Sequence, residues 1–339
     1  MRIAIVTDAW HPQRNGVVRV LSTLADTLRA MGHVVAVIEP GQFRTLPCPS
    51  YPEIPLALFP KRRLAALLEE FAPEAVHLAT EGPLGWAGRA WCLRHGHPFT
   101  TAYHTKFPHY VRARTGVPLA WPYALMRRFH GPSAAVMCPS PSVHAELGEW
   151  GFTNAVEWSH GVDTAVFHPQ PKDFLDVARP LFMYVGRVAV EKNLPAFLAL
   201  DLPGTKMVVG DGPARAGLMA RFPQVAWRIA NGDSELSRYF AAADCFVFPS
   251  LTDTFGLVML EALASGVPVA AFPVPGPLDV VGSTPVGVLD SDLGKAALAA
   301  LDIPGELCRD YASLFSWNRV AVQFLDLLQP FGRAARSAA

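Results

Sequence analysis

Short runs of apolar residues alternate with stretches of helical periodicity along this 339-residue chain, and they do so in two separate series. The first series opens with an apolar run at Arg2–Thr7, a helical pattern at Val17–Met31 and a second run at Val34–Ile38. A strand, a helix and a strand in this order form a βαβ unit with parallel strands. The chain is therefore predicted to be an α/β protein. Further apolar runs follow at Ala75–Leu78, Phe99–Ala102 and Ala134–Cys138.

A proline-rich segment separates the two series. Residues 169–180 combine prolines with mixed charges and are typical of a linker. We expect one domain over residues 1–168 and a second over 181–315. Residues 316–339 are expected to form a helix that packs back on the first domain, with a flexible tail from Gly332. Strands of the second domain are predicted at Leu181–Val185, Lys206–Val209, Cys245–Phe248 and Val267–Ala271.

Two doubly wound, Rossmann-like domains of this kind indicate where a ligand binds. In parallel α/β sheets the ligand lies outside the carboxyl ends of the strands. Two such domains facing each other form a cleft, which is a favoured place for a small-molecule site. Residues that directly follow the predicted strands are thus the first candidates for a site.

The segment Asp253–Glu261 follows the strand Cys245–Phe248. Gly256 allows a ligand close to the backbone, and the helix predicted to begin there presents N–H groups to an anion or a sugar hydroxyl. Glu261 is placed to accept hydrogen bonds from ribose hydroxyls. The alternative is an ordinary amphipathic helix whose acid faces solvent.

Arg187 and Lys192 follow the strand Leu181–Val185. Two cations at a strand end can neutralise a diphosphate, whereas the alternative is a solvated basic loop. After the next strand, Gly210 and Gly212 superficially suggest a dinucleotide fingerprint, but the third glycine is misplaced. We interpret them as a tight turn that lines a nucleotide pocket, which disfavours a nicotinamide oxidoreductase.

The first domain adds two strand-end candidates. Gly16 precedes the first helix, and amides there can reach the same diphosphate from the opposite domain. The alternative is a plain turn with a glycine. His104 follows Phe99–Ala102, near the mouth of the expected cleft. A lone histidine is more often structural, but the strand end and the basic surroundings favour ligand contact.

Residues 82–145 contain no Asp or Glu and carry seven Lys or Arg together with six His. Such a region attracts anions. Trp121 and neighbouring apolar residues lie among these cations, which suits an anionic membrane surface, and Lys61–Arg63 adds a second basic cluster. The alternative is a core helix with basic flanks. A net charge of zero and the lack of dense basic runs exclude a nucleic-acid binder.

Taken together in order and spacing, these segments resemble family 4 glycosyltransferases, which have the GT-B fold of two Rossmann-like domains facing across a cleft. The resemblance covers nearly the whole chain. It includes the Asn15-Gly16 loop, Glu81–Gly85, Tyr103-His104-Thr105, Gly161–Asp163, Gly186–Asn193, Gly210–Pro213, Phe255–Glu261 and Ser316-Trp317.

The resemblance implies roles for individual residues. Arg187 and Lys192 would bind the diphosphate of a nucleotide-sugar, and Glu261 its ribose. Asp253 would contact the donor sugar, as would the amides of Phe255 to Leu257. His104 would lie beside the reacting sugar, and Arg187, Lys192, His104 and Asp253 form the implied catalytic set. Candidates on the acceptor side are Glu81, Lys106, His109 and Tyr110.

The resemblance further implies a retaining hexosyl transfer by front-face attack, from GDP-mannose or a UDP-hexose to a lipid or glycan. Asp253 replaces the usual glutamate, and Asn15-Gly16 the usual glycine pair. A loop with Asn15-Gly16 resembles that of the branch of bacterial α-mannosyltransferases and of sulfoquinovosyl and glycosyl diacylglycerol synthases. A diacylglycerol-type or glycolipid acceptor is therefore expected. Two alternatives remain, a sugar-nucleotide epimerase and a non-catalytic partner protein that binds nucleotide-sugars.

The sequence predicts no metal, no cofactor and no route out of the cytoplasm. Asp290-Ser-Asp292 matches a DxD metal motif of another transferase fold, but it lies in a late loop. No apolar run reaches the ~18 residues of a membrane span, and Ile3–Val6 is too short for a signal peptide. The five cysteines are widely spaced and read as buried thiols. We expect a cytoplasmic protein, peripheral on the inner face of the cytoplasmic membrane where it meets lipid.

Overall fold

The computed structural model describes residues 1–13, 15–48 and 51–331, and it divides into two compact units. The first unit comprises residues 1–159 and those from Asn318 onward, and the second comprises His160–Trp317. The division falls before the predicted boundary at residue 168, because Val162 and Phe167 are buried in the core of the second unit. The segment predicted as a linker contains a short 3₁₀ helix at Lys172–Phe174 within that unit. The predicted flexible tail lies outside the described residues.

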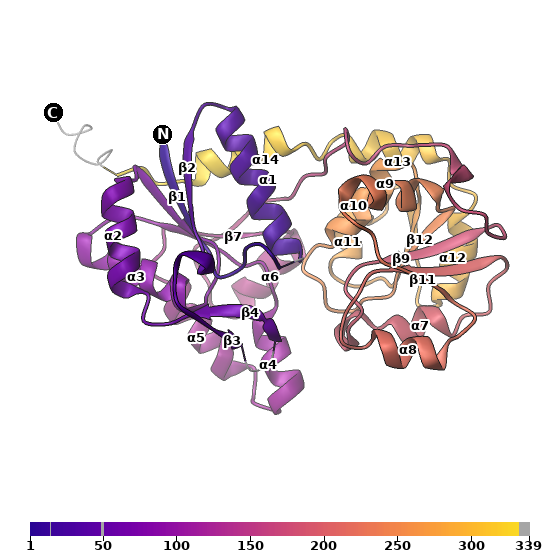
Figure 1. Ribbon diagram of the computed structural model, residues 1–339, viewed down its shortest axis with the longest axis horizontal. Helices are drawn as coiled ribbons and strands as arrows, with labels where there is room; N and C mark the ends of the chain where they lie inside the picture. The colour runs from indigo at the N-terminus through magenta and orange to yellow at the C-terminus, as the bar shows by residue number, and fades with distance from the viewer. Residues whose placement is uncertain (14, 49–50, 332–339) are drawn as a thin grey trace. The chain divides into compact units, whose positions relative to one another are not determined.

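The first unit contains a parallel six-stranded sheet in the order β2-β1-β5-β6-β7-β8 (Figure 1). An antiparallel hairpin that the sequence analysis did not anticipate, β3 and β4, lies outside this sheet. The strands are β1 Arg2–Val6, β2 Val34–Ile38, β3 Thr45–Cys48, β4 Tyr51–Ala57, β5 Ala75–Leu78, β6 Thr100–Ala102, β7 Ala135–Cys138 and β8 Ala155–Glu157. The helices are α1 Gly16–Ala30, α2 Lys61–Phe71, α3 Pro83–His95, α4 Phe107–Thr115, α5 Ala120–His130 and α6 Pro141–Glu149.

The second unit repeats the architecture, with a parallel sheet in the order β11-β10-β9-β12-β13-β14. Both units are thus doubly wound and Rossmann-like, which confirms the predicted fold class. The strands are β9 Leu181–Val185, β10 Thr205–Val209, β11 Ala226–Arg228, β12 Cys245–Phe248, β13 Val269–Ala271 and β14 Gly287–Leu289. The helices are α7 Leu194–Leu198, α8 Arg215–Arg221, α9 Asp233–Ala242, α10 Leu257–Ala264, α11 Pro277–Val280, α12 Leu293–Ala300 and α13 Gly305–Ala312.

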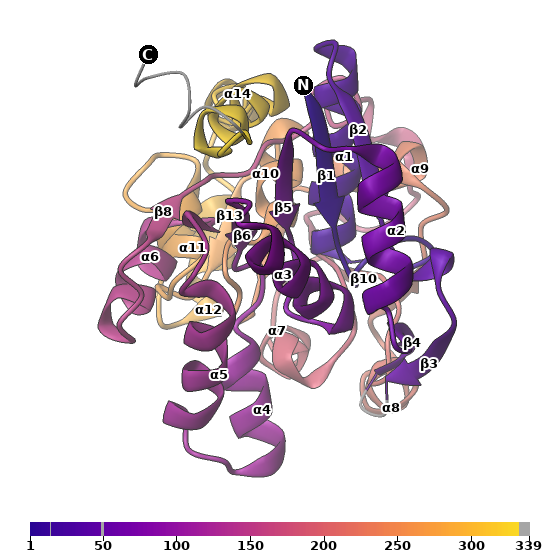
Figure 2. The ribbon, with the colours of Figure 1, turned by 90° about the vertical axis from the view of Figure 1, so that its left-hand side faces the viewer.

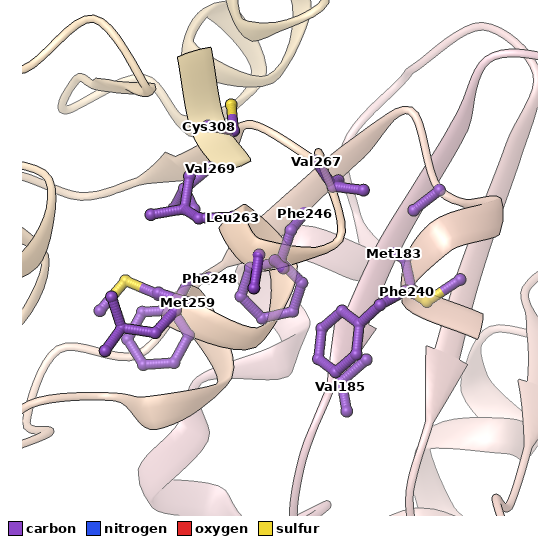
Figure 3. Close-up of a cluster of buried hydrophobic side chains, with 14 of the residues drawn as sticks. Met183, Val185, Phe240, Phe246, Phe248, Met259, Leu263, Val267, Val269 and Cys308 are labelled. Carbon is purple, nitrogen blue, oxygen red and sulfur yellow. The ribbon is translucent and has the colours of Figure 1, made fainter. Parts of the chain in front are cut away.

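Apolar side chains fill the space between each sheet and its helices. In the second unit Met183 and Val185 of β9 lie in one cluster with Phe246 of β12 and Met259 of α10 (Figure 3). Strands buried on both faces explain why their sequences are continuous apolar runs rather than alternating ones. Four of the five cysteines are buried, and no disulfide occurs among the described residues.

The last helix, α14 at Trp317–Leu327, packs on the first unit. Trp158 Nε1 donates a hydrogen bond to the carbonyl of Val320 at 3.1 Å. The Phe324 ring is fully buried, with its centroid 5.4 Å from that of Trp158. The chain therefore completes the core of its first unit with its last helix. No helix among the described residues is long and apolar enough to cross a membrane.

We expect Phe324→Ala to lower the free energy of unfolding of the first unit by about 3–5 kcal/mol, because it leaves a cavity beneath α14. Val322→Ala on the same helix is the control, since Val322 is 47% exposed. Denaturant unfolding followed by tryptophan fluorescence measures both variants. Equal effects of the two substitutions would contradict this view of the packing.

Candidate functional site

The strand order of the second sheet reverses between β9 and β12, which pair in parallel. Ligands of doubly wound sheets bind outside the carboxyl ends of the strands at such a reversal. Arg187 and Lys192 lie in the connection that follows β9, and Asp253 lies in the one that follows β12. The fold thus brings three sequence-predicted residues to the place where a ligand is expected.

Lys192 and Asp253 contact each other directly, because Lys192 Nζ donates a charge-assisted hydrogen bond to Asp253 Oδ1. The two side chains are 22% and 15% exposed. Asp253 Oδ2 is buried and has no hydrogen-bond partner among the described residues. A buried carboxylate oxygen of this kind costs free energy unless a ligand hydroxyl or water reaches it.

Asn193 belongs to the predicted motif Gly186–Asn193, but its own role was not predicted from the sequence. Its backbone is left-handed (φ 52°), and its side-chain Nδ2 donates to the carbonyl of Pro249 at 3.1 Å. This bond links the connection after β9 to the one after β12. Asparagine tolerates the left-handed region better than most residues, so one side chain supplies both the turn and the link.

Tyr184 is a second residue that sequence reasoning missed. It is fully buried in β9, and its hydroxyl donates to the carbonyl of Arg187 at 3.0 Å. Burial raises the pKa of Tyr184 well above its usual range, and the charges of Asp253 and Glu191 act in the same direction. The hydroxyl therefore stays protonated and donates to the Arg187 carbonyl. A tyrosine inside an apolar run gives no signal of this task.

Gly210 lies where the connections after β9 and β10 meet. A Cβ added there would stand 1.9 Å from the carbonyl oxygen of Gly186, and φ is +153°. A Cβ on Gly212 would stand 2.4 Å from the carbonyl oxygen of Val188. Both glycines thus permit backbone contact with the Arg187 connection. The predicted lining of a nucleotide pocket by these glycines stays a prediction.

Helix α10 begins after Gly256, whose φ of +87° favours glycine. Phe255 is buried just before the helix, and Leu257 is its first residue. Glu261 lies on α10 and is only 3% exposed. The alternative of an acidic solvent face is therefore wrong, because this carboxylate points into the protein.

The first sheet reverses between β1 and β5, and acids follow both strands. Asp8 accepts hydrogen bonds from Thr80 Oγ1 at 2.8 Å and from the Leu84 amide at 2.9 Å at the start of α3. Burial raises the pKa of Asp8, although these bonds act in the opposite direction. Gly16 is the exposed first residue of α1.

Glu81 lies close to a histidine that the sequence analysis did not single out. His130 is fully buried, and its Nε2 is 3.1 Å from Glu81 Oε1. The Nδ1 atom of the same ring is 2.9 Å from Thr101 Oγ1. His130 thereby fixes the orientation of Glu81, which remains 19% exposed.

His104 lies between β6 and α4, with its ring centroid 6.1 Å from that of Trp158. Three other predicted candidates, Tyr110, Lys106 and His109, lie on α4 or directly before it. Tyr110 is half-buried on α4. Lys106 and His109 both contact Glu146 of α6, at 2.6 Å and 2.8 Å. Lys106 is buried, so its charge is used within the protein.

Glu146 is the centre of this cluster, since Tyr123 Oη also donates to it at 2.6 Å. Burial acts to raise the pKa of Glu146. Hydrogen bonds from His109, Lys106 and Tyr123 outweigh this effect and lower the pKa to about 2. The cluster links α4 and α5 to α6. Its Lys106 follows His104 closely in the chain, directly before α4. Figure 2 shows α4 and α5 side by side.

Asp290 and Asp292, the acids of the DxD match, both contact residues of the first turn of α12. Asp292 accepts hydrogen bonds from the Gly294 and Lys295 amides and so caps α12, while Asp290 pairs with Lys295 at 3.4 Å. Among the described residues, no group of three or more His, Cys, Asp or Glu is arranged to hold a metal ion.

A pH prediction follows from the Glu146 cluster. The folded pKa is lower than the unfolded value near 4.5, so the stabilisation is present above pH 5 and is lost as the pH falls toward 2. At pH 7 we expect Glu146→Gln to be less stable by about 1–2 kcal/mol. This difference from wild type should shrink between pH 5 and pH 2.5 in denaturant titrations. A difference that stays constant would show that folding does not lower the pKa of Glu146.

A second prediction concerns Gly210. Gly210→Ala should displace the Arg187 connection and weaken binding of a nucleoside diphosphate by about tenfold, measured by calorimetry. Gly217→Ala is the matched control, since a Cβ there meets nothing within 4 Å. The control should bind as wild type does. If Gly210→Ala does so as well, the backbone contact has no bearing on the site.

Comparison with known proteins agrees with this arrangement. Residues 14–166 match the model of Glycosyltransferase Family 4, and residues 179–302 match that of Glycosyl transferases group 1. A GDP-mannose-dependent alpha-mannosyltransferase of Mycobacterium tuberculosis is 31% identical, over 85% of this chain and 83% of the relative. An alpha-monoglucosyldiacylglycerol synthase of Streptococcus pneumoniae is 28% identical, over 89% and 78%.

A solved structure extends the likeness to the fold. Sucrose-phosphate synthase from Thermosynechococcus elongatus superposes with a TM-score of 0.78 over the full length of both chains, at 21% identity. It supports the two-domain GT-B architecture and, at this identity, nothing finer. The matches to both halves of the chain, together with the Mycobacterium relative, lead to one conclusion. The chain belongs to the family 4 glycosyltransferases and is a glycosyltransferase.

Proposed function

We propose that this glycosyltransferase moves mannose from GDP-mannose to a lipid acceptor with retention of configuration. The observation that carries the proposal is the placement of Arg187, Lys192 and Asp253 on the connections after β9 and β12, with the buried Glu261 on the helix α10 that follows. Cations at that position suit a diphosphate, and a buried acid suits ribose hydroxyls. A GDP-mannose-dependent relative that is 31% identical over 85% of this chain supports this donor.

The chemistry follows from where charge develops. When the bond from the anomeric carbon to the diphosphate breaks, negative charge grows on the departing oxygen. Arg187, Lys192 and the amides at the start of α10 would stabilise that charge. The acceptor hydroxyl attacks the same face of the sugar and gives its proton to the departing phosphate. No enzyme nucleophile and no metal is needed in this scheme, and His104 would lie beside the reacting sugar.

The lipid acceptor is supported by the surface of the first unit. On α5, Trp121 is 73% exposed, Leu125 is 46% exposed and Arg128 is exposed. These positions share one helix face, while Tyr123 and Met126 are buried on the other. At the start of α2, Phe59 is 95% exposed and is followed by the exposed cations Lys61–Arg63. Cations beside apolar side chains favour peripheral binding to an anionic membrane.

Nucleotide release by the purified protein tests the proposal. GDP-mannose, UDP-glucose and UDP-sulfoquinovose are each supplied with and without anionic vesicles that contain diacylglycerol or a glycolipid. Release that needs both GDP-mannose and vesicles is expected, it should persist in EDTA, and NMR of the product should show an α-linkage. Release from a UDP-sugar alone would contradict the proposed donor. Binding without release under any condition would indicate a non-catalytic partner protein.

The proposed diphosphate contact gives a mutational prediction. Arg187→Ala should lower kcat by about 10²–10³, the usual loss when one transition-state donor is removed. Arg309→Ala is the control, since Arg309 is exposed on α13 of the same unit. Both variants should show the wild-type melting temperature. Wild-type turnover in Arg187→Ala would remove the basis for the assignment.

The membrane proposal has a separate test. Trp121→Ala should weaken co-sedimentation with vesicles rich in phosphatidylglycerol by about tenfold at low salt. Leu314→Ala removes a side chain of the second unit that is 61% exposed and should change nothing. Wild-type protein that does not sediment with such vesicles would exclude this surface as a membrane contact.

A further inference from the structure

Two side chains proposed to bind different parts of the donor bind each other in the structure. Lys192 is the proposed partner of the diphosphate, and Asp253 that of the sugar. Lys192 Nζ donates to Asp253 Oδ1, and both side chains are largely buried. The carboxylate therefore lies within a few ångströms of any phosphate group that Lys192 binds.

Like charges at this separation repel, and partial burial reduces the screening by water. A nucleoside diphosphate bears more negative charge than the corresponding nucleotide-sugar, because its terminal phosphate ionises a second time at a pKa of about 6. The repulsion from Asp253 is accordingly larger for the free diphosphate than for the intact donor.

The second oxygen of Asp253 adds an attraction that only the sugar can use. Asp253 Oδ2 is buried without a hydrogen-bond partner among the described residues. A sugar hydroxyl can donate to it, whereas a nucleoside diphosphate has no group in that place. A nucleotide-sugar that binds both Lys192 and Asp253 replaces the ion pair between them with new contacts to each side chain. A nucleoside diphosphate replaces only the contact of Lys192.

Resting on the proposed function, we propose that Asp253 is a specificity-determining residue that selects the intact nucleotide-sugar against the free nucleoside diphosphate. The negative charge of Asp253 weakens binding of the nucleoside diphosphate product, and its buried oxygen accepts a hydrogen bond from the sugar. The short aspartate side chain is bound to Lys192, whose connection is linked to that of Asp253 through Asn193 and Pro249. Asp253 thereby favours release of the product, which would otherwise occupy the site after each transfer.

Titration calorimetry of the full chain with GDP and with GDP-mannose tests this inference. In Asp253→Asn the affinity for GDP should rise and that for GDP-mannose should fall. The ratio of the two dissociation constants should change by about tenfold, which corresponds to ~1.4 kcal/mol. Asp253→Glu keeps the charge and should retain most of the wild-type selectivity. UDP and UDP-glucose are the probes if wild type binds neither guanosine ligand.

Asp290→Asn is the matched control, because Asp290 also pairs with a lysine, Lys295, in the same unit. It removes the same charge outside the connections after β9 and β12, so the selectivity should stay that of wild type. Asp253→Ser repeats the test with a smaller neutral side chain if Asp253→Asn does not fold.

The outcomes separate the two proposals. If Asp253→Asn weakens both GDP and GDP-mannose, Asp253 only orients Lys192 and the inference is wrong, while the donor site stands. If the control changes the ratio as much as Asp253→Asn does, the effect is one of net charge and the inference also fails. If wild type binds none of the four ligands, the donor site fails together with everything that rests on it.

Discussion

Parallel pairing of β9 with β12 is the constraint on which the candidate site depends. Because the two strands run the same way, their carboxyl ends lie at one edge of the sheet, although about sixty residues of chain separate them. Every proposed donor contact of the second unit except the glycines after β10 follows one of these strands. The site requires no special loop length, only the reversal of strand order that a doubly wound sheet contains.

Buried polar groups then fix the direction of the connections. Tyr184 bonds the Arg187 carbonyl, and Asn193 bonds the Pro249 carbonyl, so backbone positions rather than long flexible side chains carry the geometry. In the first unit the corresponding tasks fall to ionised or histidine side chains. Glu146 binds Lys106 and His109, and His130 orients Glu81. Breaking a buried pair leaves an unpaired group, which is why such contacts are costly to remove.

The sequence predicted several strands because continuous apolar runs are a local signal, while the roles of the site residues that follow those strands stay predictions. Continuous apolar runs such as Leu181–Val185 and Cys245–Phe248 are the strands of the structure to the residue. The hairpin β3–β4 was missed because its prolines argue against a strand. Tyr184 and His130 were missed for another reason. Their partners lie on other segments of chain or on backbone carbonyls, and a single sequence contains no trace of such a contact.

The pairing of Lys192 with Asp253 shows how a residue can be predicted and its behaviour still be missed. The family resemblance implied ligand contacts for both side chains, and the shorter acid was noted only as a departure from the usual glutamate. Because Lys192 and Asp253 are hydrogen-bonded to each other, a ligand that binds one side chain weakens the hydrogen bond of the other and must replace it. Donor and product share the nucleotide and the diphosphate, and they differ in the sugar and in the charge of the terminal phosphate. Discrimination between them must therefore come from groups that, like Asp253, respond to the charge of the phosphate and to the sugar at once.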